Sequence, residues 1–230
     1  MGPVFPHLHV ITDARPGRQP LTVVAGAVAA ARRLDACHRL AVQVRVEDDV
    51  SDRDAYELAD AVLERCRPHG VLCLVNDRLH VALAVGADGA HVGADDLPVA
   101  VARRVIGPMG VLGATCREAA AARAARRAGA SYLGVGPAFR TRTKAGLPDP
   151  LGPAAVGAVA AAVPDTPVVA IGGVTAGNAR SLIGAGAAAV AVVGAVADAA
   201  DPARATEELM RVLSASSPQL IAGARAEVRA

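Results

Sequence analysis

Aromatic side chains are scarce in this chain, and their scarcity narrows the classes of partner. Phe, Trp and Tyr make up 2% of the 230 residues, and tryptophan is absent. The charged residues balance to a formal net charge of +2 and are mixed along the chain. The sequence therefore offers neither the stacking rings nor the basic stripe of a nucleic-acid-binding surface, and we expect no nucleic-acid partner.

Long apolar runs and a targeting segment are missing as well. The longest apolar run, Leu21 to Ala31, is too short to cross a bilayer. The N-terminus lacks a charged region followed by an apolar core and a cleavage site. We therefore expect a cytoplasmic protein with no membrane association.

Cysteines are few, and their spacing does not suggest a zinc site. Cys37, Cys66, Cys73 and Cys116 form no Cys-x-x-Cys pair. We expect reduced thiols, with Cys66 and Cys73 packed in the core, whereas both core packing and nucleophilic reactivity remain open for Cys116. Of the six histidines, His91 lies between strand-like residues and is expected to be a hydrogen-bonded structural residue.

The sequence does contain a regular alternation of apolar strands and helices. The clearest helix follows Ser51, which forms a capping-box pattern with Asp54, and apolar residues then recur at helical spacing as far as Cys66. Eight apolar runs are predicted as strands: Leu8–Thr12, Leu40–Arg45, Gly70–Val75, Gly89–Gly93, Gly110–Ala114, Tyr132–Pro137, Pro167–Gly173 and Ala189–Ala195.

A weak internal repeat supports this count of strands. Gly86–Gly93, Gly129–Gly136 and Gly186–Gly194 each place Gly-Ala before an apolar run that ends in glycine, as expected for a helix end followed by a strand. Strands that are apolar throughout are typical of a parallel sheet buried on both faces. We therefore predict an α/β fold, an eight-stranded parallel (β/α)8 TIM barrel. The alternative is a doubly wound open sheet, but Gly134–Phe139 fails the dinucleotide fingerprint at its last glycine.

Polar residues follow the predicted strands, at the end where such barrels build their active sites. Asp77 and Asp96 could together bind Mg²⁺, which prefers a few hard oxygen ligands; the alternatives are a helix N-cap for Asp77 and an ordinary loop position for Asp96. Backbone N–H groups at the ends of the seventh and eighth strands, near Gly173 and Gly194, suit a phosphate. The other polar residues expected at this mouth are Arg45, Asn76, Thr115, Thr141, Thr143 and Lys144.

Four segments of the chain resemble the signature segments of the thiamine-phosphate synthase family. These are Val75–Arg78, Gly86–Pro98, Gly134–Lys144 and Ala170–Val174. The resemblance runs from Leu8 to about Leu213 in the same order and spacing. It implies a single barrel domain over residues 1–213 and a C-terminal tail over residues 214–230.

The resemblance also implies a function and a set of site residues. Members of this family transfer a hydroxymethylpyrimidine group from its diphosphate to the nitrogen of a thiazole phosphate, releasing diphosphate with the help of Mg²⁺. Asp77 and Asp96 would hold the metal, and Arg45, Thr115 and Lys144 would be the catalytic residues. The pyrimidine diphosphate would be held by Gln43, Arg45, Asn76, Thr115 and Lys144. The thiazole phosphate would be held by Thr141, Thr143, Gly173, Val193 and Gly194.

Three positions depart from the family pattern. Glu47 replaces a lysine that binds diphosphate, Arg117 replaces a histidine, and Gly194 replaces a serine. Two alternatives therefore remain beside the synthase: a thiazole tautomerase of the same superfamily, and a barrel that binds a phosphorylated ligand without turning it over. The expected partners are small-molecule substrates, and the sequence leaves the oligomeric state open, a homo-oligomer included.

Overall fold

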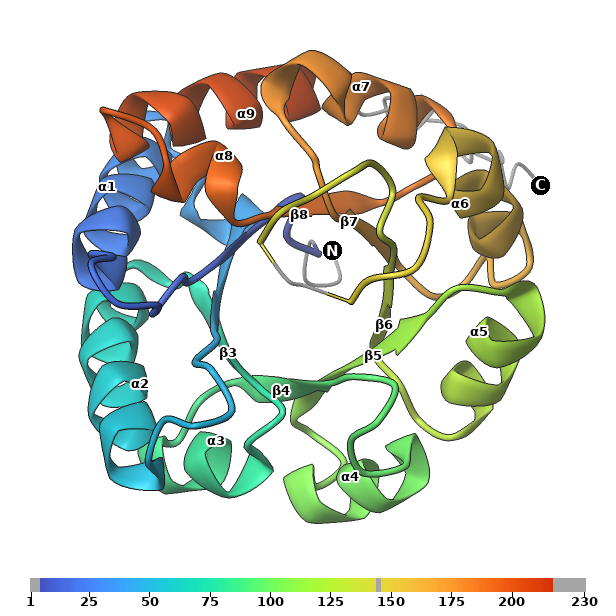
Figure 1. Cartoon of the computed structure of the whole chain (residues 1–230), viewed down its shortest axis with the longest axis horizontal. Helices are drawn as coiled ribbons and strands as arrows, with labels where there is room; N and C mark the ends of the chain where they lie inside the picture. Colours follow the sequence, from blue (N-terminus) through green and yellow to red (C-terminus); the bar gives the residue numbers. More distant parts are fainter. Residues whose placement is uncertain (1–4, 144–145, 217–230) are drawn as a thin grey trace, which may run out of the picture.

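Eight parallel strands close into a barrel in chain order, and helices surround it (Figure 1). The structure is a computed structural model, which describes residues 5–143 and 146–216. The strands are β1 (Leu8–Ile11), β2 (Leu40–Val44), β3 (Leu72–Asn76), β4 (Gly89–Val92), β5 (Val111–Cys116), β6 (Tyr132–Val135), β7 (Val168–Ile171) and β8 (Ala189–Val192). The α-helices are α1 (Pro20–Arg33), α2 (Asp52–Cys66), α3 (Leu79–Val85), α4 (Val99–Ile106), α5 (Ala119–Arg127), α6 (Gly152–Ala161), α7 (Ala176–Gly184), α8 (Gly194–Ala197) and α9 (Pro202–Ser216).

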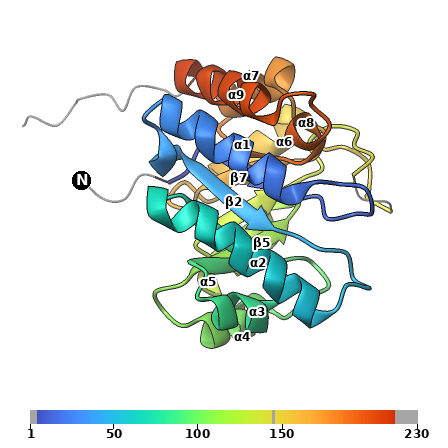
Figure 2. The same cartoon turned by 90° about the vertical axis from the view of Figure 1, so that its left-hand side faces the viewer.

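Pairing between the first and last strands decides the fold class. Leu8 in β1 lies in register with Leu40 of β2 on one side and with Val190 of β8 on the other. The sheet therefore has no edge, which confirms the predicted barrel and excludes the open sheet. Figure 2 shows β2 pointing toward the side of the barrel where the connections that follow the strands gather.

The predicted strands are present, with shifted ends. The run Gly70–Val75 forms a strand that starts at Leu72 and includes Asn76, and the fifth strand extends to Cys116. The sequence did not predict α8 or the two short 3₁₀ helices at Cys37–Arg39 and Arg67–His69. Helix α9 continues past the expected domain boundary at residue 213, and residues 217–230 of the expected tail lie outside the described residues.

Local signals in the sequence explain where the helices begin and end. The Ser51 hydroxyl accepts a hydrogen bond from the Asp54 backbone N–H at 3.1 Å and so caps α2 as predicted. Gly86, Gly129 and Gly186, which open the three repeats, all have positive φ angles after a helix. This backbone conformation costs glycine little and other residues more, which explains why the repeats begin with glycine.

The strands separate two cores. Leu8 and Val10 of β1 point outward and pack beneath the helices, in the larger core. The alternate residue Ile11 points into the barrel, where it joins Leu74 and Tyr132 in a second, smaller core. Because neighbouring residues of a strand face opposite sides, most strands contribute to both cores, whereas β2 and β4 contribute apolar residues to the larger core only. No helix among the described residues is long and apolar enough to cross a membrane.

Gly113 makes room for the rings of His91 and Tyr132 inside the barrel. It lies in register between His91 of β4 and Tyr132 of β6, and a Cβ atom added to it would overlap the Tyr132 ring and the His91 ring. We expect Gly113→Ala to lower the free energy of unfolding by about 1–3 kcal/mol, because the packed rings would have to shift.

Urea unfolding of Gly113→Ala beside Gly184→Ala tests this expectation. Gly184 ends α7 and has no atom within 4 Å of an added Cβ, so its replacement should be neutral or slightly stabilising. Equal free energies of unfolding for the two variants would contradict the packing argument.

Candidate functional site

A cavity of about 990 Å³ opens at the end of the barrel where the strands finish. Its lining includes every candidate site residue that the structure describes, drawn from seven strands and the loops after them. These residues are Gln43, Arg45, Asn76, Asp77, Asp96, Thr115, Thr141, Thr143, Gly173, Val193 and Gly194. Lys144 lies outside the described residues, so its place at this mouth stays a prediction.

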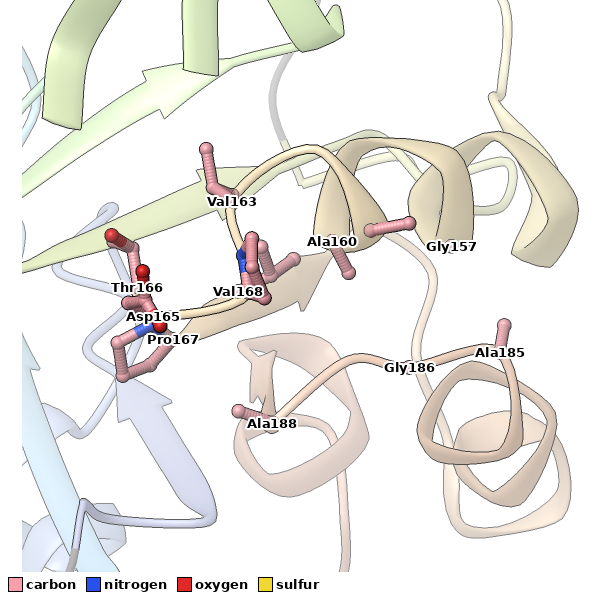
Figure 3. A pocket seen from close by; sticks show the side chains of 12 residues that line it. Gly157, Ala160, Val163, Asp165, Thr166, Pro167, Val168, Ala185, Gly186 and Ala188 are labelled. Atoms are coloured by element: carbon pink, nitrogen blue, oxygen red, sulfur yellow. The ribbon is translucent and has the colours of Figure 1, made fainter. Parts of the chain in front are cut away.

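A second, smaller cavity lies at the opposite end of the strands (Figure 3). Its volume is about 470 Å³, and its lining includes Val168, where β7 begins, and Ala188, just before β8. Small apolar residues dominate this lining, and Asp165 is the ionisable residue among the described residues that form it. Because polar groups do not converge here, the site chemistry belongs to the larger cavity.

Asp77 and Asp96 converge beside Gly93. A Cβ atom placed on Gly93 would lie 2.9 Å from Asp96 Oδ2 and 3.9 Å from Asp77 Oδ1. The Gly93 N–H donates to Asp96 Oδ2 at 2.6 Å, and Asn76 Nδ2 donates to Asp77 Oδ2 at 2.5 Å. Glycine therefore leaves a space between two oriented carboxylates that a larger residue would fill.

This pair fits Mg²⁺ better than it fits a metal held wholly by protein. Among the described residues, no group of three or more His, Cys, Asp or Glu could hold an ion. Mg²⁺ is commonly held by one or two carboxylates and completes its octahedron with water and substrate phosphate. The helix-cap alternative for Asp77 is wrong, because Arg78 is the N-cap of α3 and Asp77 has a φ of 62°.

Glu47 forms an ion pair with Arg45, the cation that follows β2. Arg45 Nη2 lies 3.0 Å from Glu47 Oε2, and both side chains are partly exposed, Arg45 by 16% and Glu47 by 32%. The buried Thr12 hydroxyl holds the Arg45 backbone, accepting from its N–H at 2.8 Å and donating to its carbonyl at 2.9 Å. The carboxylate at position 47 therefore neutralises part of the positive charge that the mouth would offer to a diphosphate.

Two arginines on the first loop add cations to the mouth. Arg15 binds the buried Asp13 carboxylate with two hydrogen bonds, at 2.8 and 2.6 Å, and this contact holds the pKa of Asp13 below its usual value. Arg18 bridges Asp13 at 3.0 Å and Asp198, at the end of α8, at 2.6 Å. The fold brings both arginines to the lining of the cavity.

The loop after β6 covers the ends of β7 and β8. In Figure 1 this loop, in yellow, crosses the opening of the barrel. The Phe139 N–H donates to the Gly172 carbonyl at 2.9 Å, and a Cβ on Gly173 would overlap the Arg140 carbonyl. Thr143 Oγ1 would lie 3.9 Å from a Cβ on Gly194. Gly173 and Gly194, the glycines predicted to bind phosphate, therefore lie next to the loop that carries Thr141 and Thr143, as the sequence predicted.

A chain of polar side chains crosses the inside of the barrel below this mouth. Gln43 Nε2 donates to the Tyr132 hydroxyl at 3.3 Å, which lies 3.0 Å from His91 Nδ1. His91 Nε2 lies 2.9 Å from Thr115 Oγ1. The prediction of a hydrogen-bonded His91 is confirmed, whereas the role of Tyr132 was missed, because a tyrosine in an apolar run looks like any other core residue.

Burial keeps the two histidines inside the barrel neutral. Burial lowers the pKa of His91 to about 4, and burial together with the nearby His91 lowers the pKa of His9 to about 3. The folded state therefore binds fewer protons than the unfolded state at pH values below about 6.5.

Stability should accordingly fall as the pH falls through this range. We expect a loss of about 2 kcal/mol per histidine in the free energy of unfolding between about pH 7 and about pH 5. Urea unfolding at both pH values measures it, and His9→Gln should lose about half of the pH dependence. The same pH dependence in His9→Gln and in the unchanged protein would contradict this origin.

Cys116, the last residue of β5, and Arg117, which follows it, both have structural contacts. Cys116 is buried, and burial raises the pKa of its thiol to about 11, which argues against the nucleophile alternative. Arg117 donates to the Gly136 carbonyl at 2.8 Å and to the Asp149 carbonyl at 2.9 Å. It therefore ties both ends of the loop after β6 to β5.

Comparisons with known proteins identify the family. A family model described as thiamine monophosphate synthase matches residues 8–196. A thiamine-phosphate synthase from Salinispora arenicola is 58% identical over 207 residues, which cover 90% of this chain and 97% of that protein. One from Moorella thermoacetica is 41% identical over 205 residues, with 89% and 93% covered. A solved thiamine phosphate pyrophosphorylase from Pyrococcus furiosus has a TM-score of 0.80 at 34% identity and covers 91% of this chain and 96% of its own. The chain therefore belongs to the thiamine monophosphate synthase family.

Proposed function

We propose that this protein joins hydroxymethylpyrimidine diphosphate to a thiazole phosphate and releases diphosphate and thiamine phosphate. The observation that carries the proposal is the convergence of the described candidate residues on one cavity, in a chain that matches the family over residues 8–196. In the reaction the bond from the pyrimidine methylene carbon to the diphosphate oxygen breaks, and a bond from that carbon to the thiazole nitrogen forms.

The two sides of the cavity suit the two substrates. On the β2–β4 side, Arg45 and the pair Asp77 and Asp96 would face the pyrimidine diphosphate. Asp77 and Asp96 would hold Mg²⁺, which when bound would neutralise negative charge on the departing diphosphate. On the β7–β8 side, Gly173 and Gly194 would offer backbone N–H groups to the thiazole phosphate.

The protein's own groups would act mainly by position and charge. Arg45 would stabilise the charge that develops on the leaving oxygen, and Lys144 is proposed to act with it. The threonine hydroxyls at 141 and 143 would hold the thiazole phosphate so that its ring nitrogen faces the methylene carbon. Holding both substrates in one cavity turns a meeting of two molecules into a step within one complex, which lowers the entropic barrier.

One incubation separates this proposal from the two alternatives. The protein is mixed with both substrates and Mg²⁺, and thiamine phosphate and diphosphate are measured against a sample that contains a chelator. A synthase forms both products only with the metal. A tautomerase would instead isomerise the thiazole phosphate alone, and a binding protein would take up ligand without any product.

A further inference from the structure

The polar chain inside the barrel has a direction, and this direction fixes what Thr115 offers to a ligand. We propose that Tyr132 is a positioning residue which, through His91, makes the Thr115 hydroxyl a hydrogen-bond donor toward the pyrimidine diphosphate. The ligand's identity rests on the proposed function, whereas the direction of the chain rests on the contacts alone.

The donors and acceptors can be assigned one by one. Gln43 donates its amide N–H to the Tyr132 oxygen at 3.3 Å. A phenol has a single proton, and the acceptor among the described contacts of this hydroxyl is His91 Nδ1 at 3.0 Å. Nδ1 therefore accepts, and it carries no proton of its own.

The tautomer of His91 passes this direction on to Thr115. Burial lowers the pKa of His91 to about 4, so at neutral pH the ring holds one proton. With Nδ1 accepting, that proton lies on Nε2, which donates to Thr115 Oγ1 at 2.9 Å. The threonine hydroxyl accepts this bond and keeps its own hydrogen for another partner.

Exposure shows where that hydrogen is available. All four residues line the cavity, but Gln43, His91 and Tyr132 are buried, whereas Thr115 is exposed. A ligand in the cavity would therefore meet a hydroxyl donor, which it can satisfy by supplying an acceptor. A pyrimidine ring nitrogen or a phosphate oxygen of the diphosphate substrate meets this requirement.

The packing holds the chain in one arrangement. The His91 and Tyr132 rings lie with their centroids 5.5 Å apart, and a Cβ on Gly134 would come within 2.9 Å of His91 Cε1. Strand glycines thus seat both rings closely. Because the rings are confined, the tautomer is set by the tyrosine hydroxyl rather than by a change of ring orientation.

The first test measures the tautomer in the full-length protein without ligand. Nuclear magnetic resonance that correlates the ring protons of His91 with its two ring nitrogens should find the proton on Nε2. In Tyr132→Phe the Nδ1 acceptor loses its donor, so a population with the proton on Nδ1 should appear. A proton on Nδ1 in the unchanged protein overturns the proposal by itself, even if Tyr132→Phe does not fold.

The second test asks whether Tyr132 acts through Thr115. Tyr132→Phe should lower kcat/KM by about three- to tenfold, the effect of one misdirected neutral hydrogen bond. Thr115→Val should lower it as well, and adding Tyr132→Phe to Thr115→Val should cause no further loss. If the loss in the double variant equals the product of the two single losses, the proposal is overturned, because Tyr132 then acts independently of the Thr115 hydroxyl.

A packing control completes the design. Phe5 packs against the Tyr132 ring with the ring centroids 5.7 Å apart. Its side chain has no polar group, so it takes no part in the hydrogen bonds that link Gln43 to Thr115. Phe5→Leu should leave the His91 tautomer on Nε2 and keep kcat/KM within about twofold. A tautomer shift in Phe5→Leu as large as that in Tyr132→Phe would overturn the role of the hydroxyl. If the protein lacks synthase activity altogether, the proposed function fails while the tautomer result still decides the direction of the chain.

Discussion

Asp77→Asn and Asp96→Asn are each expected to lower synthase turnover by about a hundredfold or more. A metal ion at a developing negative charge contributes several kcal/mol, and each substitution removes one of two anionic ligands. Folding should be little affected. Asp77 has a positive φ of 62°, which asparagine tolerates at least as well as aspartate. Steady-state rates across a range of Mg²⁺ concentrations measure the effect.

Asp95→Asn is the matched control for this pair. Asp95 lies next to Asp96 on the same loop and lines the same cavity. However, the three atoms nearest to a Cβ placed on Gly93 belong to Asp77 and Asp96, not to Asp95. Asp95→Asn removes the same negative charge from the cavity but no proposed metal ligand. It should therefore change turnover only a few-fold, because solvent and salt screen the effect of a distant charge. Full Mg²⁺-dependent turnover in both Asp77→Asn and Asp96→Asn would rule out the proposed metal ligands.

Glu47→Lys is expected to strengthen binding of the pyrimidine diphosphate by at least about tenfold at low salt. One unit charge at about 4 Å in water contributes roughly 1 kcal/mol, and the lysine changes the charge by two units. The substitution also releases Arg45, whose guanidinium is paired with Glu47 at 3.0 Å. KM for the diphosphate substrate, measured at low and high salt, tests this expectation, because salt should shrink the gain.

Glu47→Gln shows whether charge alone is responsible. If it is, affinity should rise stepwise from glutamate to glutamine to lysine. If Glu47 instead holds Arg45 in a productive position, both substitutions should weaken binding, and direct transfer of the family's binding pattern to this position would fail.

Arg15 is the candidate for the cation that the family supplies at position 47. It lies close enough to Glu47 for the carboxylate to raise its pKa, after the larger effect of its contact with Asp13. If Arg15 supplies the cation, Arg15→Ala should weaken diphosphate binding markedly, and Glu47→Lys should add little. Thermal unfolding of Arg15→Ala accompanies the kinetics, because the substitution also removes one of two partners from the buried Asp13.

The order of elements and the end of the barrel that holds the site were predicted from the sequence. Apolar runs interrupted by helical periodicity, with Gly86, Gly129 and Gly186 at regular places, leave few arrangements other than a closed parallel barrel. In such a barrel all strands point the same way. Asp77 and Thr115 therefore had to share a mouth although they follow different strands.

The contacts among those side chains were decided only by the tertiary structure. The ion pair of Glu47 with Arg45 and the two arginines on Asp13 determine how much positive charge the mouth offers, and no spacing in the sequence distinguishes a paired cation from an available one.

The same holds for the chain inside the barrel. Tyr132 and His91 lie 41 residues apart in sequence and meet because Gly113, between them in the sheet register, has no side chain. Periodicity determines which face of a strand a residue occupies. The partner it meets there depends on the register and side-chain volumes of distant strands, which local sequence does not encode.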